Sequence, residues 1–139
     1  MTETLSTSNG PANKKILLID DDSFLLDMYS LKFGAAGYEV KTANSTDVGI
    51  KMLRDGYDPD VMLADIVMPG MDGLDMVSHI RAEKLASHAT VIMLTNQGSS
   101  DDVTRARKMG VDGYIVKATT IPSQVLSEVE KICSSKKRS

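Results

Sequence analysis

The chain has few of the features that stabilise secreted or membrane proteins. Its 139 residues contain one cysteine, Cys133, which cannot form a disulfide within the chain and therefore favours a reducing compartment. No apolar run is long enough to span a bilayer. The first ten residues have neither the basic nor the apolar region of a signal peptide. We therefore expect a cytoplasmic protein without a membrane partner.

Strong net charge is also absent. The formal net charge of −3 argues against general binding of nucleic acid, and the basic segment at the end of the sequence is short. No glycine fingerprint of a dinucleotide site follows the first predicted strand. The length suits one domain whose core is large enough to fold without a disulfide or structural metal. We assign residues 1–13 to a flexible leader, 14–133 to the folded domain and 134–139 to a flexible basic tail.

Strand and helix patterns alternate along the folded domain. Five short runs predict strands, at residues 15–19, 38–43, 60–64, 90–94 and 113–117. Periodic segments predict five helices, at residues 23–33, 45–56, 74–85, 99–110 and from Pro122 onward. Phe24, Met28 and Leu31 give the first helix its apolar spacing. Largely apolar strands that alternate with helices indicate a doubly wound α/β fold, with a parallel sheet covered on both faces.

Chemically active side chains follow these strands directly. In an open parallel sheet, ligands bind beyond the carboxyl ends of the strands. Converging carboxylates there would repel one another unless a divalent cation lay among them, and ligands that are all oxygen favour Mg²⁺. A hydroxyl and an ammonium at the same edge suit phosphate oxygens, so the set suits phosphoryl transfer to or from a carboxylate. The residues delivered at the ends of strands one, three, four and five are Asp20, Asp21, Asp22, Asp65, Thr95 and Lys117.

The chain resembles the receiver domain of two-component response regulators. The matching segments are ILLIDDD, DIVMPGMDG, VIMLT and GYIVK, and the similarity runs from about Lys15 to Ile132. The resemblance implies a flavodoxin-like (βα)5 fold with five parallel strands in the order 2-1-3-4-5. It further implies a single-domain regulator similar to the chemotaxis regulators, with residues 14–133 as the receiver domain.

The resemblance also implies the acceptor and the metal ligands. Asp65 would be the residue phosphorylated. Asp21 would bind the metal directly, and Asp20 would be its partner, often acting through water. Asp65 and the backbone carbonyl of Val67 would complete a site for Mg²⁺ or Mn²⁺.

Residues of the last two strands would bind the phosphoryl group and transmit its presence. By the resemblance, Thr95 is the switch hydroxyl, Tyr114 the aromatic side chain that moves with it, and Lys117 the partner of the phosphoryl oxygens. Two positions depart from the family, which usually has a small residue where this chain has Asn96 and a proline where it has Ala118. The residues expected to tune the site are Asn96, Gln97 and Ala118.

The remaining residues of these motifs have structural roles. Asp22 is expected to cap the first helix rather than to bind metal. Pro69 and Gly73 are expected to shape the loop after the acceptor. His79 and His88 match no family site and have no metal-ligand spacing.

The resemblance implies a phosphoacceptor whose donor is a sensor histidine kinase or a histidine phosphotransfer protein. The face formed by the fourth helix, fifth strand and fifth helix would then switch its binding of an unidentified downstream protein. The chain would catalyse only its own phosphorylation and dephosphorylation. We expect no direct DNA binding, because the sequence leaves no room for a helix-turn-helix after the last helix.

Two other functions remain as alternatives. A phosphohydrolase of the haloacid-dehalogenase type could use Asp20 and Asp22 as its D-x-D pair, although the chain is short and has no cap domain. A pseudo-receiver would bind partners without taking phosphate, against which the intact set of acids, Thr95 and Lys117 argues.

Overall fold

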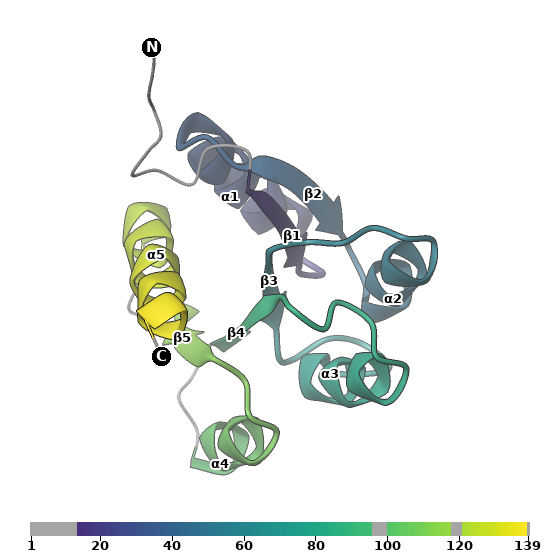
Figure 1. The fold of residues 1–139 in the computed structure, drawn as a ribbon. Helices are drawn as coiled ribbons and strands as arrows, with labels where there is room; N and C mark the ends of the chain where they lie inside the picture. The colour runs from purple at the N-terminus through teal and green to yellow at the C-terminus, as the bar shows by residue number, and fades with distance from the viewer. Residues whose placement is uncertain (1–13, 96–99, 118–120, 139) are drawn as a thin grey trace.

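The structure, a computed structural model, describes residues 14–95, 100–117 and 121–138. Five parallel strands form one sheet in the order β2-β1-β3-β4-β5 (Figure 1). They are β1 (Lys15–Ile19), β2 (Glu39–Ala43), β3 (Val61–Asp65), β4 (Thr90–Thr95) and β5 (Gly113–Val116). The helices are α1 (Ser23–Ala35), α2 (Thr46–Arg54), α3 (Gly73–Ala82), α4 (Ser100–Lys108) and α5 (Pro122–Arg138). The predicted flavodoxin-like fold and strand order are confirmed.

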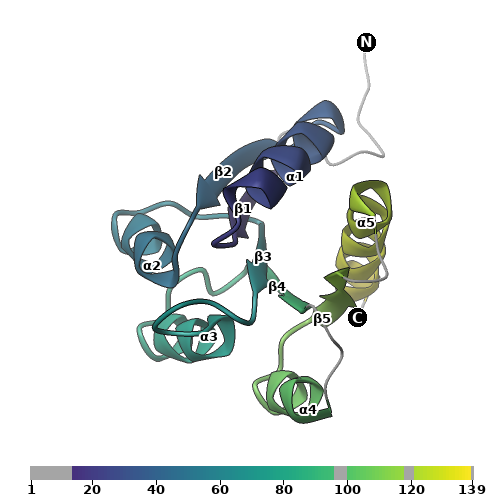
Figure 2. The ribbon, with the colours of Figure 1, turned by 180° about the vertical axis from the view of Figure 1, so that it is seen from behind.

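Helices cover both faces of the sheet, as Figures 1 and 2 show from opposite sides. Apolar residues of α1 and α5 pack with Leu18 and Leu63 on one face, and those of α2 and α3 pack with Leu17 and Met62 on the other. The three central strands β1, β3 and β4 are therefore buried on both sides, which is why their sequences are nearly continuous apolar runs, whereas the edge strand β2 is largely exposed. None of the helices in the described part of the chain is long and apolar enough to cross a membrane.

The first helix buries a different face from the one expected. Leu26, Tyr29 and Phe33 point into the core, whereas Phe24 and Leu31 are 70% and 77% exposed. The helix has apolar residues around its circumference, so spacing alone identified the helix but not the side that contacts the sheet. The last helix turns an apolar side to the sheet, because Val125 and Val129 are buried and Ile132 packs against the same cluster.

Two residues after the ends of α1, α2 and α4 the chain has a glycine with positive φ, as is common after helices: Gly37, Gly56 and Gly110. The end of α3 has the same backbone arrangement but places Lys84 there, with φ of 59°. Lys84 N–H donates to the Arg81 carbonyl at 3.1 Å, and Leu85 N–H donates to the Ile80 carbonyl at 2.8 Å. The last helix, α5, continues to Arg138 and so includes most of the segment that we assigned to a basic tail.

Candidate functional site

Sheet pairing brings the acids of β1 and β3 to the same edge. Ile19 lies opposite Ala64 in the parallel register, so Asp20, directly after β1, and Asp65, the last residue of β3, lie at the same height. Asp20 continues the ladder, because its N–H donates to the Ala43 carbonyl of β2 at 3.2 Å. The backbone thus fixes where both carboxylates begin.

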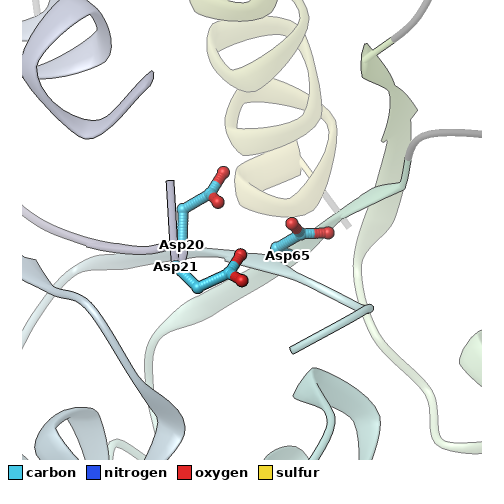
Figure 3. Close-up of side chains that lie close together, drawn as sticks. All are labelled: Asp20, Asp21 and Asp65. Atoms are coloured by element: carbon cyan, nitrogen blue, oxygen red, sulfur yellow. The ribbon is translucent and has the colours of Figure 1, made fainter. Parts of the chain in front are cut away.

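Three carboxylates converge at this edge (Figure 3). Asp20, Asp21 and Asp65 each offer an oxygen, and these oxygens lie within 4.8 Å of one another. Asp20 and Asp65 are 1% and 3% exposed, whereas Asp21 is exposed to solvent. Two buried acids and an exposed one thus form a cluster of oxygen ligands that solvent can reach at Asp21, which suits a Mg²⁺ that keeps some of its waters.

Lys117 joins the two buried acids. Its ammonium Nζ lies 2.9 Å from Asp65 Oδ2 and 3.1 Å from Asp20 Oδ2. Lys117 leaves β5 at the far edge of the sheet, so its long side chain reaches across the end of β4. One cation cannot neutralise three carboxylates, and the excess negative charge fits a site for a divalent cation.

The electrostatics of this pair favour a reactive carboxylate. Burial raises the pKa of Asp65 above its usual value, although its hydrogen bond with Lys117 acts in the opposite direction. Burial alone would lower the pKa of Lys117, but the hydrogen bonds to Asp65 and Asp20 outweigh it and the pKa is raised. The lysine is therefore an ammonium, and the Asp65 carboxylate is more basic than usual and hence a better nucleophile.

The segment after Asp65 folds back against it through a close backbone contact. Gly73 N–H donates to the Ile66 carbonyl at 2.8 Å, which closes the loop between β3 and α3. A Cβ at Gly73 would lie 2.1 Å from the Asp65 carbonyl oxygen, so no larger residue fits without movement. Val67 N–H donates to Asp65 Oδ1 at 3.3 Å and helps to orient the carboxylate.

The structure describes some of the other predicted residues and not others. Thr95 is buried at the end of β4, next to the strand that carries Asp65. Tyr114 lies on β5 with its side chain 38% exposed. Asp22 caps α1 as expected, because its Oδ1 accepts hydrogen bonds from the N–H groups of Phe24 and Leu25 at 3.0 and 3.2 Å. Three predicted tuning residues lie outside the described residues: Asn96, Gln97 and Ala118.

One residue near the site was missed by the sequence analysis. Thr46, the first residue of α2, is buried, and its hydroxyl donates to the Met71 carbonyl at 3.0 Å. A threonine at a helix start has many ordinary roles, and its partner lies 25 residues away in the sequence. No local pattern could have identified this contact.

Comparisons with known proteins agree with this geometry. A family model described as "Response regulator receiver domain" matches residues 16–129. The chain is 36% identical over 121 residues to the chemotaxis protein CheY of Pseudomonas aeruginosa, an alignment that covers 85% of this chain and 94% of CheY. It is 28% identical over 119 residues to the phosphate regulon transcriptional regulatory protein PhoB of the same species, which covers 86% of this chain. The chain spans about half (51%) of the length of that PhoB.

Solved structures are similar over most of the chain. The chemotaxis response regulator CheY4 of Vibrio cholerae matches with a TM-score of 0.79 and 26% identity, over 87% of this chain and 99% of that one. A CheY-like receiver domain protein from Methanospirillum hungatei matches with a TM-score of 0.79 and 29% identity, over 92% of this chain and 100% of that one.

Proposed function

Because the chain belongs to the family of response regulator receiver domains, we propose that it is a phosphoacceptor and that Asp65 takes the phosphoryl group. The observation that supports this most strongly is the position of Asp65. Its carboxylate is buried beside two further acids, and one of its oxygens is 2.9 Å from the ammonium of Lys117. Within the proposal, residues 14–133 form the receiver domain.

The proposed reaction is a transfer onto a carboxylate oxygen. An oxygen of Asp65 attacks phosphorus, the bond between phosphorus and the donor breaks, and the donor leaves with that electron pair and takes up a proton. Lys117 holds the attacking carboxylate now and would pair with the phosphoryl oxygens as negative charge moves onto them. Hydrolysis of the acyl phosphate returns Asp65 to its carboxylate and releases inorganic phosphate.

The oxygen ligands for Mg²⁺ in this proposal are carboxylates of Asp20, Asp21 and Asp65 and the Val67 carbonyl. When bound, the ion would supply positive charge that offsets the repulsion between these acids and the incoming phosphoryl group. Asp20 is already engaged, since its Oδ1 accepts from Asp22 N–H at 3.0 Å and its Oδ2 pairs with Lys117. The exposed Asp21 is therefore the acid most available for direct binding, with Asp20 as its partner.

The donor we propose is a phosphohistidine on a sensor histidine kinase or a histidine phosphotransfer protein. Small acyl phosphates share the needed chemistry, a good leaving group on phosphorus, and serve as probes of the site. The phosphorylated chain would then bind a downstream protein through α4, β5 and α5. In this switch the Thr95 hydroxyl turns toward the phosphoryl group, and Tyr114, which is now partly exposed, follows into the vacated space.

The haloacid-dehalogenase alternative is not favoured by the position of Asp22. That class needs the second acid of the D-x-D pair in the active site. Here the Asp22 carboxylate accepts hydrogen bonds from two backbone N–H groups at the start of α1 and is exposed. Its contacts are those of a helix cap.

The test of the proposal is labelling with a small phosphodonor. The protein is incubated with Mg²⁺ and acetyl phosphate, and its intact mass is measured. We expect a gain of one phosphoryl group that depends on Mg²⁺, is removed by hydroxylamine and is absent in Asp65→Asn. The matched control is Asp22→Asn, which keeps the helix cap and should be labelled like the wild type. Equal labelling of Asp65→Asn would refute the assignment.

A further inference from the structure

The loop that follows the acceptor is held at both of its limbs. We call residues 66–72, between β3 and α3, the acceptor loop. Its first half, which we call the outgoing limb, carries Val67, whose carbonyl is a proposed metal ligand and whose side chain is 61% exposed. The next residue, Met68, is buried and anchors this limb in the core, and Gly70, with φ of 76°, turns the chain. The position of the Val67 carbonyl therefore depends also on what holds the returning limb.

A hydrogen bond from α2 holds the second half of the acceptor loop, the returning limb, which leads to α3. The Thr46 hydroxyl donates to the Met71 carbonyl at 3.0 Å, and Thr46 is only 2% exposed. The bond is partly buried, and losing the hydroxyl would leave the carbonyl without this side-chain partner or let the loop move. Met71 itself packs against the core on this face of the sheet.

The hydroxyl is also fixed relative to the other half of the site. Thr46 is the first residue of α2, so the packing of that helix sets its position; the helix cap is the preceding residue, Ser45, whose Oγ accepts from Val48 N–H at 3.1 Å. One turn later α2 touches β1, because a Cβ at Gly49 would lie 3.0 Å from Ile19 Cδ1. Ile19 is the residue immediately before Asp20 and Asp21. A short chain of contacts thus runs from the acids after β1, through α2, to the acceptor loop after β3.

From these contacts we infer that Thr46 is a positioning residue of the cation and phosphoryl site. Its hydroxyl sets the distance between the Val67 carbonyl on the acceptor loop and the carboxylates of Asp20 and Asp21. Asp65 is fixed by β3 and does not need this bond, whereas the loop carbonyl does. The inference rests on the proposed function, since it concerns the affinity of the same site for Mg²⁺.

The test compares Mg²⁺ binding in three variants by isothermal titration calorimetry. Thr46→Val keeps the shape of the side chain and removes the donor, and it should weaken Mg²⁺ binding about tenfold, the lower range for partners that orient metal ligands. Thr46→Ser keeps the donor and should bind within about twofold of wild type. Ser45→Ala removes the helix cap next to it and should lower the melting temperature without changing Mg²⁺ affinity.

Phosphorylation gives a second readout. The rate of labelling by acetyl phosphate at subsaturating Mg²⁺ should fall in Thr46→Val and recover when Mg²⁺ is raised. Since Thr46 is buried, folding of each variant is checked by its thermal transition, and Thr46→Ala removes the same hydroxyl with a smaller side chain if Thr46→Val does not fold.

Two results would overturn the inference alone: equal Mg²⁺ affinity in wild type and the variants lacking the hydroxyl, or the same loss of affinity in Ser45→Ala. Absence of Mg²⁺ binding in the wild type would instead refute the proposed function, and this inference with it.

Discussion

Replacing Gly73 with alanine should damage the site, although alanine is the better helix former. The added Cβ would lie 2.1 Å from the Asp65 carbonyl oxygen and 3.0 Å from Met93 Cε. Ordinary contacts between a Cβ and another heavy atom begin near 3.4 Å, so α3 or β3 must move away by about 1 Å. Helix propensity would favour alanine by less than the ~1 kcal/mol of a helix interior, since Gly73 is the first residue of α3. Overpacking of backbone against backbone costs roughly 1–3 kcal/mol and outweighs that gain.

A shift of this size should be visible in chemistry as well as in stability. Misplacement of reacting groups by 1 Å can cost about 100-fold in rate. We expect Gly73→Ala to unfold at lower urea concentration and to be labelled by acetyl phosphate about 100-fold more slowly. The control is Gly34→Ala in α1, where a Cβ meets no atom within 4 Å and should raise the unfolding free energy by about 0.4–1 kcal/mol without changing the labelling rate. Wild-type stability and rate in Gly73→Ala would refute this reasoning.

Three further predictions concern other parts of the fold. Lys84→Gly should raise the unfolding free energy measured by urea denaturation by about 1 kcal/mol, because glycine adopts the left-handed backbone at this helix end without strain. An unchanged unfolding free energy would contradict the φ of 59° at Lys84. Asp21→Asn should raise the melting temperature of the metal-free protein, because it removes repulsion among the clustered carboxylates. It should also abolish the stabilisation by Mg²⁺, which in the wild type is about 1.4 kcal/mol at a Mg²⁺ concentration tenfold above Kd. A Mg²⁺ effect that persists in this variant would exclude Asp21 as a ligand. Burial acts to raise the pKa of Asp72, but hydrogen bonds from Asp75 N–H and Arg105 lower it below its usual value. Its charge therefore stabilises the fold above the unfolded pKa of about 3.9, and this stabilisation is lost as pH falls through the lower folded pKa. Asp72→Asn should keep the helix cap but have a lower unfolding free energy than the wild type at pH 7, and it should lose less of it as the pH falls. Unfolding free energies of the two proteins that run parallel with pH would contradict this.

The order and type of the elements could be predicted because both follow from local patterns. Apolar runs between periodic segments are enough to indicate a parallel sheet with helices on both faces. The side of α1 that contacts the sheet could not be predicted, since apolar residues occur around that helix, and only packing places Tyr29 and Phe33 inside and Leu31 outside. The end of α3 was also missed, because the sequence has Lys84 where the other helix ends have glycine.

The acids of the candidate site were predictable for a different reason. Each lies at or just after the end of a strand, and the parallel register brings Asp20 and Asp65 to one edge. The roles of these residues came from resemblance to a family rather than from spacing, and they remain predictions for experiment. Thr46 could not be found in this way, because its contact with Met71 joins segments that are close only in the folded chain.

The most direct test of the central claim is to locate the phosphoryl group chemically. Borohydride reduces an acyl phosphate to an alcohol, which converts a phosphorylated aspartate to homoserine. Trypsin then separates the candidates, because Asp65 lies in the peptide 55–81 and Asp20, Asp21 and Asp22 lie in the peptide 16–32. After treatment with acetyl phosphate and Mg²⁺, tandem mass spectrometry should place homoserine at position 65. Homoserine in the peptide 16–32, or at another aspartate of 55–81, would contradict the assignment of Asp65 as the acceptor.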